Sequence, residues 1–322
     1  MIRKNYLIFF LLIIIYILKF KNENEIKFSY PLKKNNYINK KFMIIQHTCL
    51  TCGLFSFYKV SLGCIHKFIA EGYIPIIDIR TYPNIMNGFN KTKINNWELF
   101  FEQPFNYKLE DVIKNAKTIV YLNDSWRFCG KWPDQRVLPF TDVEKYYWHH
   151  FANKYLSIKK ELIKLSKKIM HRLFKSSKNI LGVLIRGTDY VAMKPIGHPI
   201  QPNLTDIIRD VKEMDKKYIY DYIFFSTEDE IIKEKFSKIF HKKVKYIKSR
   251  IKINYDYSKK VFIAYNNKIK DYIEYNKLYL LNIIILSKAL DILTPKCNGA
   301  VGIFILTNGF RHIKLYNLGL YP

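Results

Sequence analysis

Hydrophobic residues near the start of the folded part alternate between short continuous runs and a segment with helical spacing. Residues 42–46 (FMIIQ) and 73–79 are apolar runs, and residues 58–71 between them carry apolar side chains at helical spacing up to Gly72. A strand, a helix and a second strand in this order predict a β-α-β unit. Its strands would be parallel, with the working loops at their carboxyl ends.

The same alternation returns in the second half of the chain. Strands are expected at residues 180–185, 222–226 and 243–247, with helices at residues 204–214, 230–240 and 277–289 and a further apolar run at residues 291–309. The middle is less regular, with a strand at residues 118–122 and a long helical region at residues 142–170. The pattern predicts an α/β protein of two Rossmann-like domains facing a cleft, at residues 42–175 and 176–322.

The N-terminal segment has a different pattern. An apolar run at residues 6–18 is flanked by basic residues on both sides, and residues 23–41 are rich in Lys and Asn. The run is short for a bilayer span, but no small-residue cleavage site follows it. We expect a signal-anchor at residues 1–22 and a stem at residues 23–41, with a peripheral anchor or a cleaved signal left open. The protein would then be anchored to a membrane as a single-pass protein, with a Golgi-type lumenal location in a eukaryote or an inner-membrane association in a bacterium.

Charge adds a preference for anionic partners. The 322 residues include 54 Lys and Arg against 27 Asp and Glu, a net charge of +27. The lysines are scattered, and the abundance of Lys, Asn, Ile, Tyr and Phe is what an AT-rich genome favours through its codons. We find no RNP-like aromatic stretch, zinc-finger spacing or basic helix with heptads, and so we expect no nucleic-acid partner.

The five cysteines do not suggest a disulfide framework, because their number is odd and the chain is long. Cys49 and Cys52 have the spacing of a redox motif, but no other thioredoxin-like feature accompanies them. No second pair supplies a zinc site either. We therefore expect no metal centre.

The segment VLIRGTDYVAMKPIGHPIQPN at residues 183–203 carries the strongest chemical signal. Arg186, Gly187, Thr188 and Asp189 directly follow a buried strand, at the edge where open α/β sheets bind ligands. A guanidinium can hold phosphate oxygens through two parallel hydrogen bonds, glycine lets a backbone N–H come close, and threonine adds a hydroxyl. The set suits a diphosphate. The alternatives are an Arg186–Asp189 ion pair that pins a turn, and a His198 that caps a turn instead of contacting a ligand.

This segment resembles the donor-binding motif of the α-1,6-fucosyltransferase family, in which an Arg-Arg-Thr-Asp-type stretch is followed nine residues after the aspartate by His-Pro-Ile. This chain has Arg186 and Gly187 where the family has two adjacent arginines. Asp189 and His198 keep that spacing, and HPI is intact at residues 198–200. Two later blocks are similar in the same order: FFSTED at residues 224–229, and residues 286–294 with Asn298 and Gly299 behind them. The three blocks cover roughly the C-terminal half.

The resemblance implies a GT-B fold, GDP-fucose as the donor substrate, inversion at the sugar, and no metal or other cofactor. Arg186 would hold the diphosphate and, with Asp189, form the catalytic pair. The remaining donor-binding residues would be Gly187, Thr188, His198, Glu228, Asp229, Thr294 and Asn298. A guanidinium placed in advance would stabilise the charge that develops on the departing GDP.

The motif also departs from the family. Lys194 stands where those enzymes have a glutamate, so the general base is unassigned. Glu98 and Glu102 are candidates, with pairing to lysines as the alternative. We expect a fucosyltransferase acting on a glycan or glycolipid acceptor. Two alternatives are a glycosyltransferase that uses another nucleotide sugar, and an inactive glycan-binding or scaffold protein.

Overall fold

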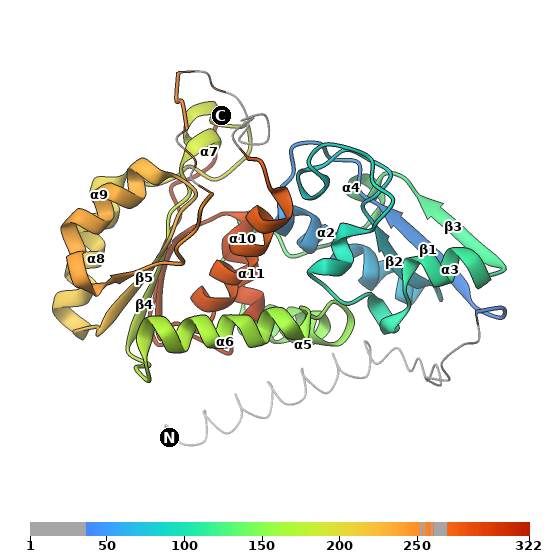
Figure 1. Cartoon of the computed structure of the whole chain (residues 1–322), viewed down its shortest axis with the longest axis horizontal. Coiled ribbons are helices and arrows are strands. Elements are labelled where there is room, and N and C mark those ends of the chain that lie inside the picture. Colours follow the sequence, from blue (N-terminus) through green and yellow to red (C-terminus); the bar gives the residue numbers. More distant parts are fainter. Residues whose placement is uncertain (1–36, 252, 254, 259, 261–268) are drawn as a thin grey trace, which may run out of the picture. The chain divides into compact units, whose positions relative to one another are not determined.

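The structure is a computed structural model that describes residues 37–251, 253, 255–258, 260 and 269–322 (Figure 1). The predicted signal-anchor and most of the predicted stem lie outside the described residues. Within the described ranges, no helix combines the length and the apolar character needed to cross a membrane.

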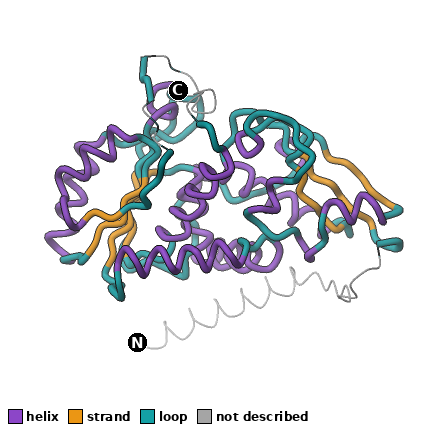
Figure 2. Tube along the Cα trace, viewed as in Figure 1, coloured by secondary structure: helices purple, strands orange, loops and turns teal. Residues whose placement is uncertain are grey.

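The strands form two separate parallel sheets, visible as two groups in Figure 2. The first has the order β2-β1-β3, with β1 at Lys41–Gln46, β2 at Ile74–Asp78 and β3 at Thr118–Leu122. The second has the order β6-β5-β4-β7-β8, and its strands are β4 Ile180–Leu184, β5 Tyr222–Ser226, β6 Val244–Lys245, β7 Asp291–Pro295 and β8 Ile313–Tyr316. All pairings are parallel, which confirms the predicted α/β class.

The helices alternate with these strands. They are α2 Leu54–Ala70, α3 Leu109–Asn115, α4 Ser125–Phe128, α5 Asp142–Tyr155, α6 Lys160–Phe174, α7 Thr188–Met193, α8 Leu204–Tyr218, α9 Glu230–Phe240, α10 Tyr272–Leu286 and α11 Asn298–Leu306. Short 3₁₀ turns occur at η1 Ile85–Asn87, η2 Asn96–Leu99, η3 Pro104–Asn106, η4 Gln135–Val137 and η5 His241–Lys243.

The expected helical region at residues 142–170 is two helices. The chain leaves helical geometry between α5 and α6 because Glu102 N–H donates to Ser157 O at 2.8 Å and Lys159 N–H donates to Phe100 O at 3.0 Å. These bonds make a short antiparallel contact that competes with the helical ladder. α10 begins earlier than expected because the Asp271 side chain accepts the Glu274 N–H and caps the helix there.

The five-stranded sheet is covered on both faces, with α8 and α9 on one side and α10 and α11 on the other (Figure 1). Every residue of β4 is buried, as expected for a central parallel strand. Ile207 of α8 and Phe236 of α9 pack in one cluster with β4 and β5. On the other face α10 lies so close that a Cβ at Gly182 would come within 3.2 Å of Leu286 Cδ2.

Helices α2 and α11 join the part around the first sheet to the part around the second. A Cβ at Gly302 of α11 would lie 2.2 Å from Cε1 of Phe55, so only glycine allows this approach. One turn away, Asn298 Nδ2 donates to Ser56 Oγ at 2.6 Å. Residues separated by 242 positions in the chain therefore share one tightly packed helix contact.

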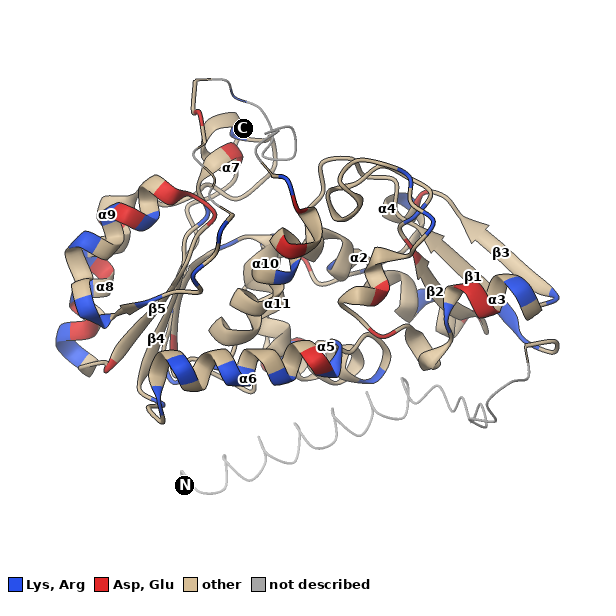
Figure 3. Ribbon diagram, in the orientation of Figure 1, with Lys and Arg blue, Asp and Glu red and all other residues tan. Residues whose placement is uncertain are grey.

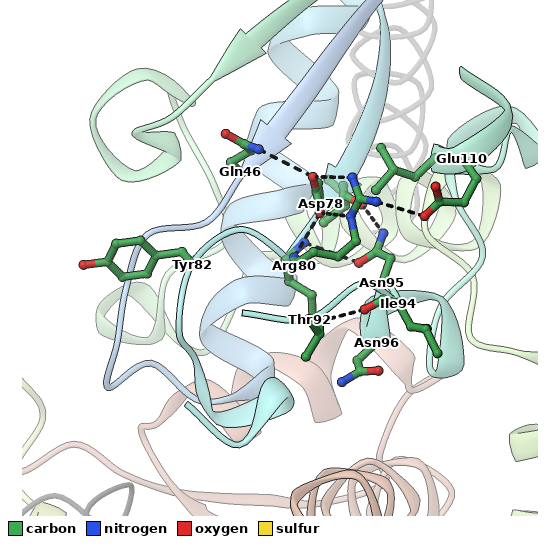
Figure 4. Close-up of polar contacts among 12 residues, drawn as sticks. Gln46, Asp78, Arg80, Tyr82, Thr92, Ile94, Asn95, Asn96 and Glu110 are labelled. Carbon is green, nitrogen blue, oxygen red and sulfur yellow. Dashed lines mark hydrogen bonds and ion pairs between the residues drawn. The ribbon is translucent and has the colours of Figure 1, made fainter. Parts of the chain in front are cut away.

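The carboxyl end of β2 holds a closed polar cluster (Figure 4). Arg80 Nε and Nη2 donate to the two oxygens of Asp78 at 2.9 and 3.1 Å, and Nη1 donates to Glu110 at 2.9 Å. Asp78 is 1% exposed. Arg80 neutralises the buried Asp78 and ties the start of the loop after β2 to Glu110 of α3.

Four of the five cysteines form disulfides, Cys49–Cys52 and Cys64–Cys129. This differs from the expectation that an odd count means no framework. The fold brings Cys64 of α2 next to Cys129 at the end of α4, and the unpaired Cys297 is buried at the start of α11.

Candidate functional site

Strand register places the three predicted motif blocks at one edge of the five-stranded sheet. Leu184 pairs with Ser226 and Val183 pairs with Leu293, so Arg186 after β4, Glu228 after β5 and the residues after β7 emerge side by side. The chain passes from β4 to β5 on one side and later to β7 on the other. The crevice between β4 and β7 is thus a topological switch point, the usual ligand site of such sheets.

Arg186 is held by two carboxylates. Its Nη1 lies 3.0 Å from Glu228 Oε1 and its Nη2 donates to Asp189 Oδ1 at 3.3 Å. The guanidinium carbon also lies 5.3 Å from the ring centre of Tyr190. Burial alone would lower the pKa of Arg186, but the charges of Glu228 and Asp189 outweigh it and hold the pKa well above its ordinary value. The guanidinium has five N–H donors, and the two contacts leave donors for a ligand.

Gly187 and Thr188 are fixed by the loop after β5. A Cβ at Gly187 would lie 2.9 Å from Ile232 Cδ1 and 3.3 Å from Asp229 Cβ. The Gly187 N–H and the Thr188 hydroxyl both donate to Glu228 Oε1 at 3.0 Å. Thr188 has φ of 49°, a strained value for a β-branched residue that persists only under such constraint. The sequence predicts that Gly187 lets a backbone N–H come close to a ligand. In this structure the missing side chain of Gly187 allows the loop after β4 to pack closely against the loop after β5.

Glu228 and Asp229 have different environments although they are adjacent. Glu228 lies in the site and contacts Arg186, whereas Asp229 is fully buried and caps α9 by accepting the Ile231 and Ile232 N–H groups. Asp229 also accepts a hydrogen bond from the Tyr257 hydroxyl. Of this pair, Glu228 is the one placed to meet a ligand.

His198 sits in a turn that is locked by the C-terminal segment. Gly197 N–H donates to Tyr321 O at 2.9 Å and Tyr321 N–H donates to His198 O at 2.8 Å. His198 Nδ1 lies 2.7 Å from the Tyr190 hydroxyl. Burial, then the charges of Lys59 and Arg136, lower the pKa of His198. The nine-residue spacing from Asp189 thus returns the imidazole to the same crevice.

Two cavities meet at Arg186. The β4–β7 cavity has a volume of about 240 Å³ and is lined by Thr51, Cys52, Gly53, Leu54, Phe55, Ser56, Ile85, Arg186, Asp189, Tyr190, Pro195, His198, Tyr275, Asn276, Tyr279, Cys297, Asn298 and Gly299. The β4–β5 cavity has a volume of about 100 Å³ and is lined by Leu184, Arg186, Phe225, Ser226, Thr227, Glu228, Glu230, Lys233, Tyr246, Ile247, Ser249, Ile251, Ile253, Tyr275, Leu278, Tyr279 and Asn282. Arg186 with Tyr275 and Tyr279 forms the wall that both cavities share.

The two tyrosines of α10 were not among the predicted site residues. Tyr275 and Tyr279 are one helical turn apart, and a Cβ at Gly299 would lie 2.6 Å from the Tyr279 hydroxyl. The i, i+4 tyrosine pair just before the third motif block is a signal that could have found them. Ser56 and the Cys49–Cys52 loop were also missed as site residues, because the spacing of Cys49 and Cys52 indicates redox or metal chemistry and not a cavity wall.

The remaining candidates lie elsewhere. Thr294 is fully buried in β7 and donates to Pro295 O. Glu102 forms an ion pair with Lys159 at 2.7 Å, and Glu98 accepts hydrogen bonds from Gln103 and the Leu109 N–H. Neither glutamate lines the two cavities. Lys194 ends α7 in the left-handed region with φ of 47° and is exposed.

Among the described residues, no group of three or more His, Cys, Asp or Glu side chains is arranged to hold a metal ion. The charged groups that line the β4–β7 cavity are instead a guanidinium and a carboxylate. The polar groups beside them are hydroxyls, an imidazole and carboxamides. These donors and acceptors suit an anionic, hydroxyl-rich ligand.

No protein-family model and no curated protein matches the chain. Solved structures that are similar include NodZ α-1,6-fucosyltransferase soaked with GDP-fucose, with 13% identity, a TM-score of 0.47 and coverage of 83% of this chain and 93% of that one. Fucosyltransferase NodZ from Bradyrhizobium shows 12% identity and a TM-score of 0.46, with coverage of 83% and 94%. POFUT1 in complex with GDP shows 9% identity and a TM-score of 0.47, with coverage of 86% and 98%.

Proposed function

We propose that this protein is an inverting glycosyltransferase of the GT-B type that transfers fucose from GDP-fucose to a glycan or glycolipid acceptor. The observation that carries the proposal is the position of Arg186 in the wall between two cavities at the switch point of the sheet. A nucleoside diphosphate sugar has three parts in a row. The nucleoside would occupy the β4–β5 cavity, the diphosphate would lie at Arg186, and the sugar would enter the β4–β7 cavity.

The motif spacing supports the donor assignment. Asp189 and His198 line the same cavity, as the fucosyltransferase resemblance implies, and Glu228 contacts the same guanidinium. When the sugar–phosphate bond breaks, negative charge grows on the departing diphosphate. Arg186 is already positioned and partly desolvated, so it would stabilise that charge without reorganising.

The acceptor would reach the sugar in the β4–β7 cavity past Ser56 and residues 51–53, which form its other wall. Asp189 contributes a carboxyl group to the lining of that cavity, and His198 contributes an imidazole. Glu98 and Glu102 stay the predicted candidates for the general base.

We also propose that the protein is held at a membrane by its N-terminal apolar run and works in an oxidising compartment. The two disulfides support the second point, because such bonds persist in secretory or periplasmic spaces and are rare in the cytosol.

The test is GDP binding and fucose transfer by the purified full chain. Calorimetric titration with GDP, UDP and ADP should show selective binding of GDP, and a panel of nucleotide sugars should show turnover of GDP-fucose. Arg186→Lys keeps the charge but loses the two-pronged grip, so transfer should fall by about 10-fold to 100-fold. Arg209→Lys is the matched control, because Arg209 contacts Asp206 and Asp210 on α8, outside both cavities. Turnover of a different nucleotide sugar in place of GDP-fucose would show that the proposed donor is wrong. GDP binding with no transfer to any acceptor would favour a glycan-binding protein.

A further inference from the structure

Helix α6 carries a basic face that the proposed function does not use. The helix buries Leu162, Ser166, Ile169 and Phe174 and exposes Lys160, Lys164, Lys167 and Lys168. At about 100° per residue these four lysines fall within a sector of about 100°. The Lys and Arg segments repeat along α6 in Figure 3. The helix thus presents a row of positive charges on the side opposite its packed face.

Nothing in the described structure neutralises this row. Glu161 is the one acidic residue of α6, and none of the four lysines forms an ion pair with a described residue. By contrast, α8 also exposes three lysines, Lys212, Lys216 and Lys217, but carries four acidic residues within the same helix. Exposed lysines are therefore common in this chain, whereas α6 exposes four of them with a single acidic residue in the helix, Glu161.

The positive field extends beyond the helix. Lys288, which follows α10, donates to Leu306 O at 3.0 Å and lies near enough to Lys167 for the two charges to repel each other. His171 is exposed one turn beyond Lys167 on the same face. Surface charges this close act together within one Debye length, about 8 Å at physiological salt.

We propose that the basic face of α6, formed by Lys160, Lys164, Lys167 and Lys168, lies against an anionic membrane surface and binds phospholipid headgroups. Attraction to an anionic membrane surface grows by about 1 kcal/mol with each lysine near it. The contact therefore requires anionic lipid in the leaflet that faces the folded part. The predicted anchor would keep the folded part within reach of a bilayer, so even a weak surface contact would be occupied. Arg172, one turn beyond Lys168 near the end of α6, is also exposed and adds a further positive charge. The four-lysine face has no exposed aromatic side chain, the group on which nucleic-acid bases stack.

The test compares vesicles of pure phosphatidylcholine with vesicles that also contain phosphatidylserine, using the full chain. The apolar N-terminus contributes to binding of both kinds of vesicle. The ratio of the two partition coefficients therefore isolates the contribution of charge. Lys160→Gln, Lys164→Gln and Lys167→Gln together should lower that ratio by about a hundredfold at low salt. The matched control is Lys212→Gln, Lys216→Gln and Lys217→Gln on α8, which removes the same charge and should leave most of the ratio.

Two results would overturn the proposal. Equal losses in the α6 and α8 variants would mean that net charge alone attracts the protein to the vesicles. A larger loss of duplex DNA binding than of vesicle binding in the α6 variant would make the face a nucleic-acid site. Thermal unfolding and GDP binding should be unchanged in both variants, because neither set of lysines lines a cavity at Arg186.

Discussion

Arg186 Nη1 lies 3.0 Å from Glu228 Oε1, and this ion pair joins the ends of β4 and β5. The side chains are 22% and 11% exposed, so the pair is largely removed from water. Asp189, 9% exposed on its side chain, adds a second carboxylate on the same guanidinium. The arginine that would bind the diphosphate is therefore also the counter-charge for two partly buried acids.

Removing that arginine should cost stability as well as activity. Arg186→Ala leaves Glu228 and Asp189 without their cation, and we expect the free energy of unfolding to fall by about 3–5 kcal/mol. Urea denaturation measures the loss. Adding Glu228→Gln to the same chain should recover part of it, because one of the two uncompensated charges disappears. Arg209→Ala, a change at an exposed arginine with two carboxylate contacts, should have little effect; a loss equal to that of Arg186→Ala would contradict the argument.

His47 should make stability depend on pH. The side chain is fully buried between Ser125 Oγ and Ser61 Oγ, at 2.6 and 2.7 Å, and burial lowers its pKa from 6.5 to about 3. The unfolded chain therefore binds a proton that the folded chain does not, and stability falls as pH drops from about 6.5 toward 3. The slope from this group is about 1.4 kcal/mol per pH unit. His47→Gln should remove that part of the slope in denaturation at several pH values, while His150→Gln, at an exposed histidine, should retain it.

The Cys64–Cys129 disulfide should contribute more stability than Cys49–Cys52. It joins positions 65 residues apart, and chain entropy predicts a loss of about 4 kcal/mol when both cysteines become serine. The Cys49–Cys52 disulfide joins positions only 3 residues apart, so the double serine variant at these two positions should lose much less stability. Because Cys52 lines the β4–β7 cavity, the second variant should instead slow the proposed transfer from GDP-fucose. Equal melting temperatures for the two variants would contradict the prediction that the Cys64–Cys129 disulfide contributes more stability.

Gly302→Ala should separate α2 from α11. The new methyl group would meet the Phe55 ring at 2.2 to 2.9 Å, and a ring cannot give way as a flexible chain end can. We expect a loss of about 1–3 kcal/mol or more in thermal unfolding, together with weaker GDP-fucose turnover, since Ser56 lies beside Phe55 in the cavity wall. Gly53→Ala is the control for thermal unfolding alone, because nothing lies within 4 Å of a Cβ there, whereas Gly53 itself lines the β4–β7 cavity. Combining Gly302→Ala with Phe55→Leu should restore part of the stability if the clash is the cause.

The sequence predicted the sheet-forming parts well because their signals are local. Runs such as ILGVL at residues 180–184 are apolar throughout, and a central parallel strand needs only that. Arg186 and Asp189 were placed together for the same reason: both follow such a strand directly, and both line the β4–β7 cavity. Their role in binding or catalysis stays a prediction.

The other site features depend on contacts that no local pattern encodes. Tyr279 reaches the cavity because Gly299 leaves space for its hydroxyl, and Ser56 reaches it because α2 packs on α11. Asp229 looks like a ligand residue in sequence, but its position at the start of α9 makes it a helix cap. The break between α5 and α6 likewise follows from hydrogen bonds to residues 100–102, far away in the chain.

The contact between α2 and α11 also sets the order in which the protein can fold. Phe55 and Ser56 find their partners about 240 positions later, so α2 keeps an exposed apolar flank until α11 has formed. Closing a loop of that length is entropically costly and slow compared with forming the local β-α-β units. The cavity wall that α2 and α11 build together therefore forms only once both ends of the chain are present, and until then the apolar side of α2 that contains Phe55 stays exposed.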